Sequence, residues 1–198
     1  MEHDKPSIIL LTETWLTPVL PDGLVNLRGY KLFRKDRPSK KGGGVCMYLA
    51  DQVLSNFHVS PITFDCAAIE ALFYTFSNKD VTFVLGCVYR PSSTFLGDDK
   101  VLFDCITPLT QLYEKKFIFG DFNMPNVSWP FDPSQSFDVS SQLLVDLFVN
   151  SHLHQHVLQP TRYRSNQNPS LLDLIISSDD ISLSSLDLIR LVFRIISR

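Results

Sequence analysis

Residues 116–129 read KFIFGDFNMPNVSW, and this segment indicates the kind of fold that the chain adopts. A short apolar run, residues 117–119, stops at Gly120 and is followed at once by Asp121 and Asn123. A short, fully apolar run is typical of a central strand that is buried on both faces. Side chains two apart in a strand point to the same side, so Asp121 and Asn123 can face one ligand if the strand continues that far. An Asx turn is the alternative interpretation of these residues.

Strand patterns dominate much of the remaining chain. Residues 7–11 and 44–50 are apolar runs, while residues 67–76 and 81–89 are rich in β-branched and aromatic side chains. The latter two flank a short polar turn, which predicts a β-hairpin. Residues 171–176, LLDLII, form another apolar run that carries one acid.

Two helices are expected between the strands. Residues 98–116 follow helical spacing with Asp98 as the N-cap, although Pro108 should kink or split this helix. Residues 140–150 carry one apolar face, with a serine as N-cap and Asn150 as C-cap. Hairpins mixed with separate helices predict an α+β fold in which helices cover mostly antiparallel sheet. With 198 residues, 44% of them hydrophobic, we expect one domain around a two-sheet core.

The composition argues against several classes of protein. No apolar run approaches the roughly 20 residues of a membrane span, and the start of the chain has no signal-peptide pattern. The 4 cysteines form no C-x-x-C pair, which indicates free thiols in a reducing compartment. We therefore expect an intracellular protein, nuclear or cytoplasmic. The net charge of −3 means that nucleic-acid binding would require bound cations or the basic residues 31–41, which could equally form a solvated loop.

Polar residues recur at the ends of the expected strands or within them, namely Glu13, Tyr89, Asp121 and Asp173. A Glu and an Asp from different strands provide hard oxygen ligands that suit Mg²⁺ better than zinc. A nearby Asn can orient a water molecule, and a Tyr hydroxyl can donate to an oxyanion. Each residue also has a purely structural interpretation, such as capping for Glu13. A purely structural interpretation is less convincing for Asp173, since an acid inside LLDLII is expected to be buried and to need a partner.

The motifs LTETW, GGGV, VYRP, GDFNMPNVSW, QPTR and SLLDLIISS occur in this order along the chain. The ordered set resembles the endonuclease/exonuclease/phosphatase superfamily, and within it the endonuclease region of jockey-like non-LTR retrotransposons. The resemblance covers roughly residues 7–178. It implies a four-layer α/β/β/α sandwich over residues 1–178, incomplete at both termini, and a divergent tail at residues 179–198.

The resemblance also implies a function, which is hydrolysis of DNA phosphodiester bonds with Mg²⁺ or Mn²⁺, nicking a target duplex for reverse transcription. Glu13 then matches a metal ligand, and Asp121 the residue that activates the attacking water. Asn123 matches a residue that orients the water and the phosphate, Tyr89 one that contacts the phosphate, and Asp173 one that holds a catalytic histidine. The residues that we expect to contact phosphate or DNA are Thr161, Arg162, Arg34, Lys35, Lys40 and Lys41.

The chain departs from this family at both ends. The family begins with a strand that carries a metal-site Asn and ends in Ser-Asp-His, and neither is present in this sequence. We therefore expect truncation at both ends, with weak or lost activity, and a reverse transcriptase that acts in trans or has been lost. A catalytically inactive retroelement remnant and a phosphatase of the same superfamily are the alternatives.

Overall fold

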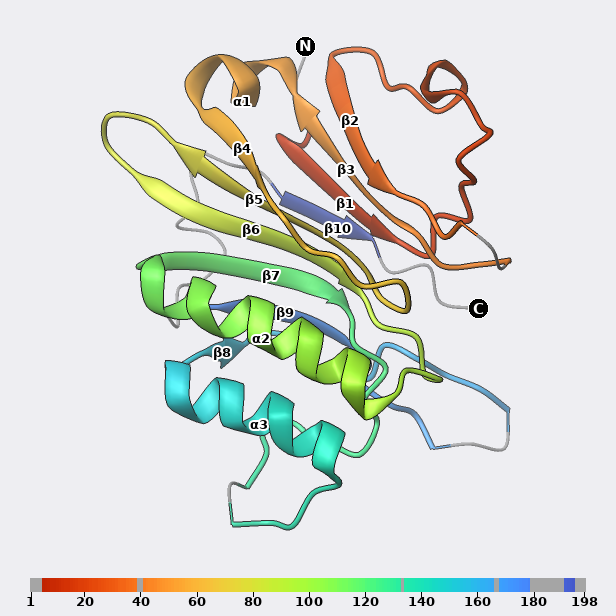
Figure 1. The fold of residues 1–198 in the computed structure, drawn as a ribbon, viewed down its shortest axis with the longest axis vertical. Coiled ribbons are helices and arrows are strands. Elements are labelled where there is room, and N and C mark those ends of the chain that lie inside the picture. Colours follow the sequence, from red (N-terminus) through yellow and green to blue (C-terminus); the bar gives the residue numbers. More distant parts are fainter. Residues whose placement is uncertain (1–4, 39–40, 133, 166–167, 179–190, 195–198) are drawn as a thin grey trace.

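Two β-sheets packed face to face form the centre of the molecule (Figure 1). The computed structural model describes residues 5–38, 41–132, 134–165, 168–178 and 191–194. The four-stranded sheet has the order β10 (Leu191–Arg194), β1 (Ile8–Thr12), β3 (Val45–Ala50), β2 (Tyr30–Lys35). The six-stranded sheet has the order β4 (His58–Ile62), β5 (Glu70–Ser77), β6 (Thr82–Tyr89), β7 (Lys115–Asp121), β9 (Asp173–Ser177), β8 (His154–Gln155). Neighbouring strands are antiparallel except for β1–β10 and β6–β7, which are parallel.

Alternate residues of the central strand β6 belong to two different apolar layers. Phe83, Leu85 and Cys87 pack between the two sheets. Val84 and Val88 point to the opposite face and pack beneath the helices. This two-residue period is what a strand buried on both faces requires. It fixes Tyr89, the last residue of β6, on the side of the sheet that faces the other sheet.

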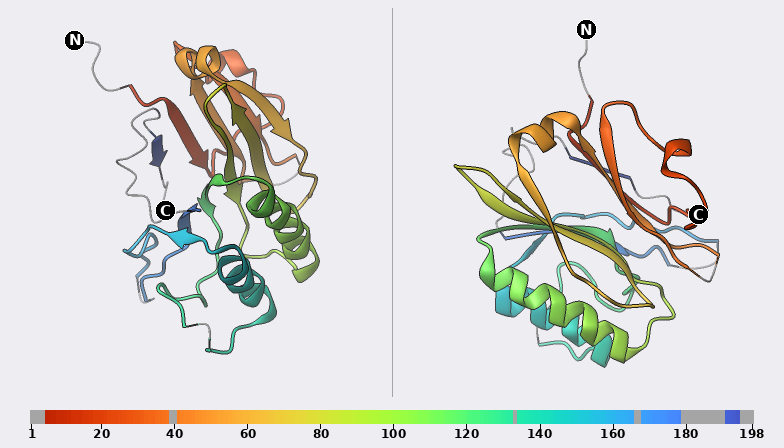
Figure 2. Two further views of the ribbon diagram at one scale, coloured as in Figure 1. Left: turned by 90° about the vertical axis from the view of Figure 1, so that its left-hand side faces the viewer. Right: turned by 45° about the horizontal axis from the view of Figure 1, so that its top comes forward.

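The helices cover the outer face of the six-stranded sheet. The helices α2 (Leu96–Leu112) and α3 (Val139–Ser151) lie side by side on this face (Figure 2). The outer face of the other sheet is covered by residues 13–29, which include the short 3-10 helix η1 (Asp22–Leu24). Tyr48 and Arg34 donate hydrogen bonds from the sheet to carbonyl oxygens of that segment. The predicted α+β sandwich of two mostly antiparallel sheets with flanking layers is confirmed.

The helix boundaries differ from the predicted ones for identifiable reasons. Helix α2 begins at Leu96 with Phe95 in the N-cap position, and it continues through Pro108 without splitting. Pro108 lies on the exposed side of the helix, where the carbonyl that loses its hydrogen bond can reach water. Helix α3 is capped by Asp138, whose carboxylate accepts from the backbone N–H of Ser141 at 3.0 Å. His152, at a φ of 49°, is its C-cap in place of Asn150.

Four strands were not predicted from the sequence. Strand β2 lies in the basic run and β4 carries Pro61, and both are edge strands, where charges and proline are tolerated. The two-residue strand β8 is too short to give a pattern. Strand β10 comes from the expected tail and pairs in parallel with β1, while residues 179–190 and 195–198 lie outside the described residues. A short helix, α1 (Asp51–Asn56), connects β3 to β4. No helix among the described residues is long and apolar enough to span a membrane.

Candidate active site

Four polar residues form a row across the end of the six-stranded sheet. Glu70 is paired with Tyr89, Tyr89 with Asp121, and Asp121 with Asp173, on the neighbouring strands β5, β6, β7 and β9. Strand neighbours in register present their side chains on the same face of a sheet. In this case it is the face toward the second sheet, because Tyr89 belongs to the apolar layer between the sheets. The sheet therefore holds three carboxyl groups and a phenol side by side.

Asn123 joins this row through a turn rather than through the strand. Strand β7 ends at Asp121, and Asn123 has a φ of 48°, in the left-handed region. The carboxylate of Asp121 accepts a hydrogen bond from the backbone N–H of Asn123 at 3.0 Å. The strand geometry therefore does not continue to Asn123, and the structure has the Asx turn that was the alternative interpretation. The turn still places the Asp121 and Asn123 side chains next to each other.

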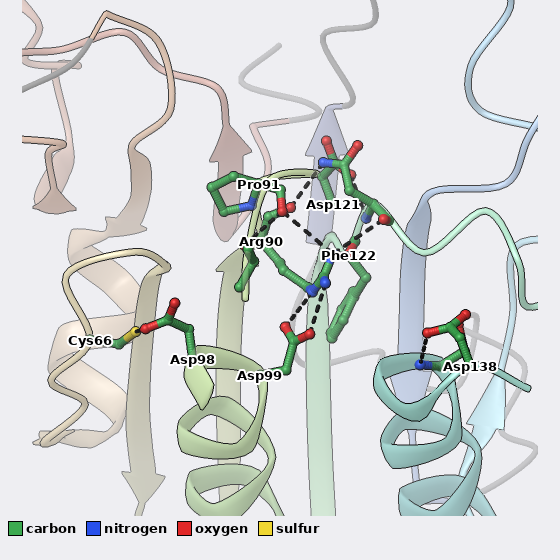
Figure 3. Close-up of polar contacts among 11 residues, drawn as sticks. Cys66, Arg90, Pro91, Asp98, Asp99, Asp121, Phe122 and Asp138 are labelled. Carbon is green, nitrogen blue, oxygen red and sulfur yellow. Dashed lines mark hydrogen bonds and ion pairs between the residues drawn. The ribbon is translucent and has the colours of Figure 1, made fainter. Parts of the chain in front are cut away.

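The side chain of Arg90 holds this turn in place (Figure 3). Its guanidinium binds Asp99 of helix α2 with two hydrogen bonds, of 2.6 and 2.9 Å. It also donates to the backbone carbonyl oxygens of Phe122 and Asn123, at 3.3 Å each. In return, the Asn123 amide donates to the carbonyl oxygen of Arg90 at 3.0 Å. With Nδ2 fixed in this way, the orientation of the Asn123 amide is determined by the fold.

Glu13 reaches the same row from the other sheet. It follows β1 directly and has a φ of 52°. Its Oε2 accepts hydrogen bonds from Trp15 Nε1 at 2.7 Å and from the Gly43 N–H at 2.9 Å. Burial alone would raise the pKa of Glu13, but hydrogen bonds from Tyr89, Gly43 and Trp15 together lower it. Glu13 is therefore held as a carboxylate against the Tyr89 hydroxyl, and burial together with this hydrogen bond raises the pKa of Tyr89.

Asp121 and Asp173 form the acidic part of the row. Burial, and then the neighbouring Asp173 carboxyl group, raise the pKa of Asp121 to about 8. Burial raises the pKa of Asp173 to about 6, against a hydrogen bond from Thr161 that lowers it. Thr161 Oγ1 also accepts from the N–H groups of Leu172 and Asp173, at 3.1 Å each. The acid in LLDLII is thus buried, as expected, and Thr161 is a hydrogen-bonding partner.

The expected DNA-contacting residues differ in what they contact, and only some of them lie beside the site. Arg34 binds Asp22 at 3.0 Å, and Lys35 donates to the carbonyl oxygen of Phe64 at 3.0 Å. Lys41 lies over the ring of Trp15, beside Glu13, at 5.3 Å. Arg162 follows Thr161 and is bridged to Ser170, whereas Lys40 lies outside the described residues.

Sequence reasoning missed two ion pairs at this end of the sandwich, Arg37–Glu70 and Arg90–Asp99. Glu70 carried a usable signal, since it is an acid inside the apolar run AAIEALF, as Asp173 is in LLDLII. Arg90 and Asp99 carried none, because nothing in a single sequence indicates that a strand end and a helix start will meet.

Comparison with known proteins shows the family to which the chain belongs. The model of the Endonuclease-reverse transcriptase family matches residues 83–192, which is more than half of the chain. The chain belongs to the endonuclease-reverse transcriptase family. No curated protein matches the sequence of this chain.

Solved structures share the fold of this endonuclease-reverse transcriptase domain at low sequence identity. The endonuclease domain of TRAS1, a telomere-specific non-LTR retrotransposon, superposes with a TM-score of 0.59 at 14% identity, covering 88% of this chain and 73% of that one. The 3′ phosphatase NExo from Neisseria, bound to a product DNA hairpin, gives 0.58 at 14% identity, covering 88% and 77%. The human Nocturnin catalytic domain gives 0.54 at 15% identity, covering 87% and 69%. The fold is therefore that of the endonuclease/exonuclease/phosphatase superfamily.

Proposed function

We propose that this domain hydrolyses DNA phosphodiester bonds with the help of a divalent cation, and nicks a target duplex so that a reverse transcriptase can prime. The observation that carries the proposal is the row of Tyr89, Asp121 and Asp173, with Glu13 and Asn123 brought to it from two other segments. The similarity to the TRAS1 endonuclease domain and the family membership support it. The proposed substrate, DNA, implies an intracellular site of action.

The residues present fit a bound Mg²⁺ or Mn²⁺ ion. Asp121 is half-buried beside the buried Asp173, and their pKa values lie near 8 and 6, so a nearby cation would favour their charged forms. No three His, Cys, Asp or Glu side chains group closely enough among the described residues to hold a metal by themselves. Mg²⁺ commonly uses one or two carboxylates together with water and substrate phosphate oxygens. We propose Glu13 as a ligand; the cation would neutralise phosphate charge and lower the pKa of a bound water.

The chain's own residues would then act on the attacking water and the phosphate. Asp121, in its ionised form, would accept a proton from the water. The Nδ2 of Asn123 is bound to the Arg90 carbonyl oxygen, which leaves the Oδ1 of the amide to orient that water. The Tyr89 hydroxyl donates to Glu13 in the free protein and can donate to a phosphate oxygen in the complex. Asp173, which is hydrogen-bonded to Thr161, would add a second fixed carboxyl group beside Asp121.

DNA binding would depend on local positive charge, because the net charge of the chain is −3. Lys41 is the best placed of the described candidates, since it lies beside Trp15 and Glu13. Thr161 and Arg162 lie at the Asp173 end of the row of polar residues. We propose that these residues, with Arg34, Lys35 and Lys40, contact the DNA backbone without reading its sequence.

Conversion of supercoiled plasmid to the nicked form with Mg²⁺ tests the function directly. We expect slow nicking by the natural chain and none by Asp121→Ala. Equal nicking by the two proteins would overturn the proposal. If neither protein nicks, the chain is an inactive remnant; if phosphate is released from a 3′-phosphorylated oligonucleotide without nicking, it is a phosphatase.

A further inference from the structure

Arg37 contacts the Glu70 end of the row of polar residues and has not yet been assigned a role in the site. Its Nε and Nη2 donate to the two carboxylate oxygens of Glu70, at 2.7 and 2.8 Å. Its guanidinium lies 5.4 Å from the centre of the Tyr89 ring. Its charge also acts on Glu13, where it favours the ionised carboxylate. One cation therefore touches or influences three of the polar groups at this end of the sandwich.

The glycine run at residues 42–44 leaves room for this arginine. Gly43 has a φ of 71°, and a Cβ at that position would lie 2.5 Å from the Arg37 guanidinium carbon. The N–H of Gly43 meanwhile donates to Glu13. Only glycine satisfies both the backbone conformation and the close approach at this position. The backbone is therefore shaped around Arg37 and Glu13 together.

Stability alone does not account for the Arg37–Glu70 pair. A buried ion pair is often matched or exceeded in stability by apolar side chains of similar volume. The pair does, however, hold a positive charge against Tyr89 and near Glu13, on a site whose other side chains are acidic and would repel an anionic substrate. The Arg37 side chain retains 16% of its exposure, whereas that of Glu70 retains 3%. Among the described residues, Nη1 of Arg37 makes no hydrogen bond.

We infer that Arg37 binds the scissile phosphodiester, with its Nη1 donating to a non-bridging phosphate oxygen beside Tyr89. Glu70 would orient the Arg37 guanidinium through the two hydrogen bonds between them. This inference rests on the proposed function, because it names a further residue that contacts the same substrate. Arg37 supplies the charge and the hydrogen bond, and Glu70 is a positioning residue that acts through it. A guanidinium suits this role because its planar shape lets it bind a carboxylate and a phosphate at the same time.

Nicking kinetics give the first test. We expect Arg37→Ala to lower kcat/KM by about 10- to 100-fold, the usual effect of losing one charged hydrogen bond. Lys79→Ala is the matched control, because it also removes one positive charge but lies in the turn at the far end of the β5–β6 hairpin. Because Arg37→Ala leaves Glu70 buried without a partner, the double variant Arg37→Met/Glu70→Leu is needed to separate loss of contact from loss of fold.

Binding of the dinucleotide dTpdT, which has a single phosphodiester, gives the deciding test. Its neutral methylphosphonate analogue has nearly the same shape, and both are titrated in EDTA by NMR so that no metal contributes. We expect the natural chain to bind dTpdT at least about 10-fold more tightly than the analogue, as for other charged hydrogen bonds, and the double variant to bind both equally. A double variant that keeps the preference overturns the role of Arg37 alone. A natural chain without the preference overturns the proposed phosphodiester site as well.

Discussion

Asp121 and Asp173 oppose each other directly across the β7–β9 ladder, so that two carboxyl groups share one buried position at the end of the sheet. Two adjacent carboxylates in a low-dielectric environment cannot both ionise without a compensating cation. Burial raises the pKa of Asp173 to about 6, and burial together with the neighbouring Asp173 carboxyl group raises the pKa of Asp121 to about 8. Ionising both carboxyl groups therefore destabilises the folded protein, and binding of a cation or a proton removes this destabilisation.

The stability of the metal-free protein should fall as the pH rises from about 4 to about 8. Both groups have raised pKa values, so their contribution to the free energy of unfolding is fully present below the ordinary value of 3.8. It is lost as the unfolded chain ionises while the folded chain still binds the protons. Melting temperatures in EDTA across this range check the prediction, and Asp121→Asn should flatten the curve. A curve for Asp121→Asn as steep as that of the natural chain would contradict it.

Mg²⁺ should raise the melting temperature more at pH 8 than at pH 5. Metal and proton compete for the same carboxylates, and a ligand that binds only the folded state must stabilise it. At 100 times its Kd the ion would add about 2.7 kcal/mol. Differential scanning fluorimetry with increasing Mg²⁺ measures this effect. Glu13→Gln and Asp121→Asn should each reduce it, whereas an unchanged response in both variants would place the metal elsewhere.

Loss of the Arg90–Asp99 pair should disturb the site even where the fold survives. Arg90→Ala leaves Asp99 buried without a partner and should destabilise the domain by about 3–5 kcal/mol. Arg90→Met/Asp99→Leu should recover most of that stability but not the nicking rate, because the carbonyl groups of Phe122 and Asn123 lose their donor. Urea unfolding and plasmid nicking, measured on the same preparations, separate the two effects. Normal nicking by the double variant would show that the turn holds its shape unaided.

Two glycine substitutions should have opposite effects. A Cβ at Gly120 would lie 1.9 Å from the carbonyl oxygen of Val88, so Gly120→Ala must push β6 and β7 apart. A Cβ at Gly97, in the first turn of α2, meets nothing within 4 Å. Gly97→Ala should therefore stabilise the domain by about 0.5–1 kcal/mol, whereas Gly120→Ala should destabilise it by several times as much. Thermal unfolding of both variants gives the comparison.

Asp138→Ala should cost about 1 kcal/mol, the usual value of an N-cap, and should leave the nicking rate unchanged. Hydrogen bonds from Ser141 lower the pKa of Asp138 to about 2. Its contribution is therefore present above pH 3.8 and is lost as the pH falls toward 2. Asp65→Ala, at an exposed acid outside helix α3, is the control for a simple loss of charge. Equal unfolding free energies for the two variants would rule out the cap.

The sequence alone allowed the central strands and the acidic residues at their ends to be predicted, because apolar runs of period two are local signals. Asp173 was recognised as buried for the same reason. Edge strand β2 was missed, since its alternation is obscured by charges that keep an exposed edge from pairing with other chains. The choice between a strand and an Asx turn at Asn123 was left open, because the hydrogen bonds between Asn123 and Arg90 join residues 33 positions apart.

The two arginine pairs mark the limit of prediction from one sequence. Arg37 and Glu70 are 33 residues apart, and only the packing of one sheet on the other brings them together. Arg90 and Asp99 are 9 residues apart, but the path of the strand-to-helix connection between them could not be predicted from the sequence. Such pairs depend on tertiary geometry, which propensity and periodicity do not encode.

The alignment of Glu70, Tyr89, Asp121 and Asp173 across four strands also restricts how the gene can change over time. Inserting or deleting one codon within β5, β6, β7 or β9 would turn one of these side chains to the helix side and leave its neighbours facing an apolar residue. Lineages of this domain should therefore record length changes in the connections, such as residues 156–170, and almost none inside these strands. Length variation among related genes would locate the site even where every residue in it had been replaced.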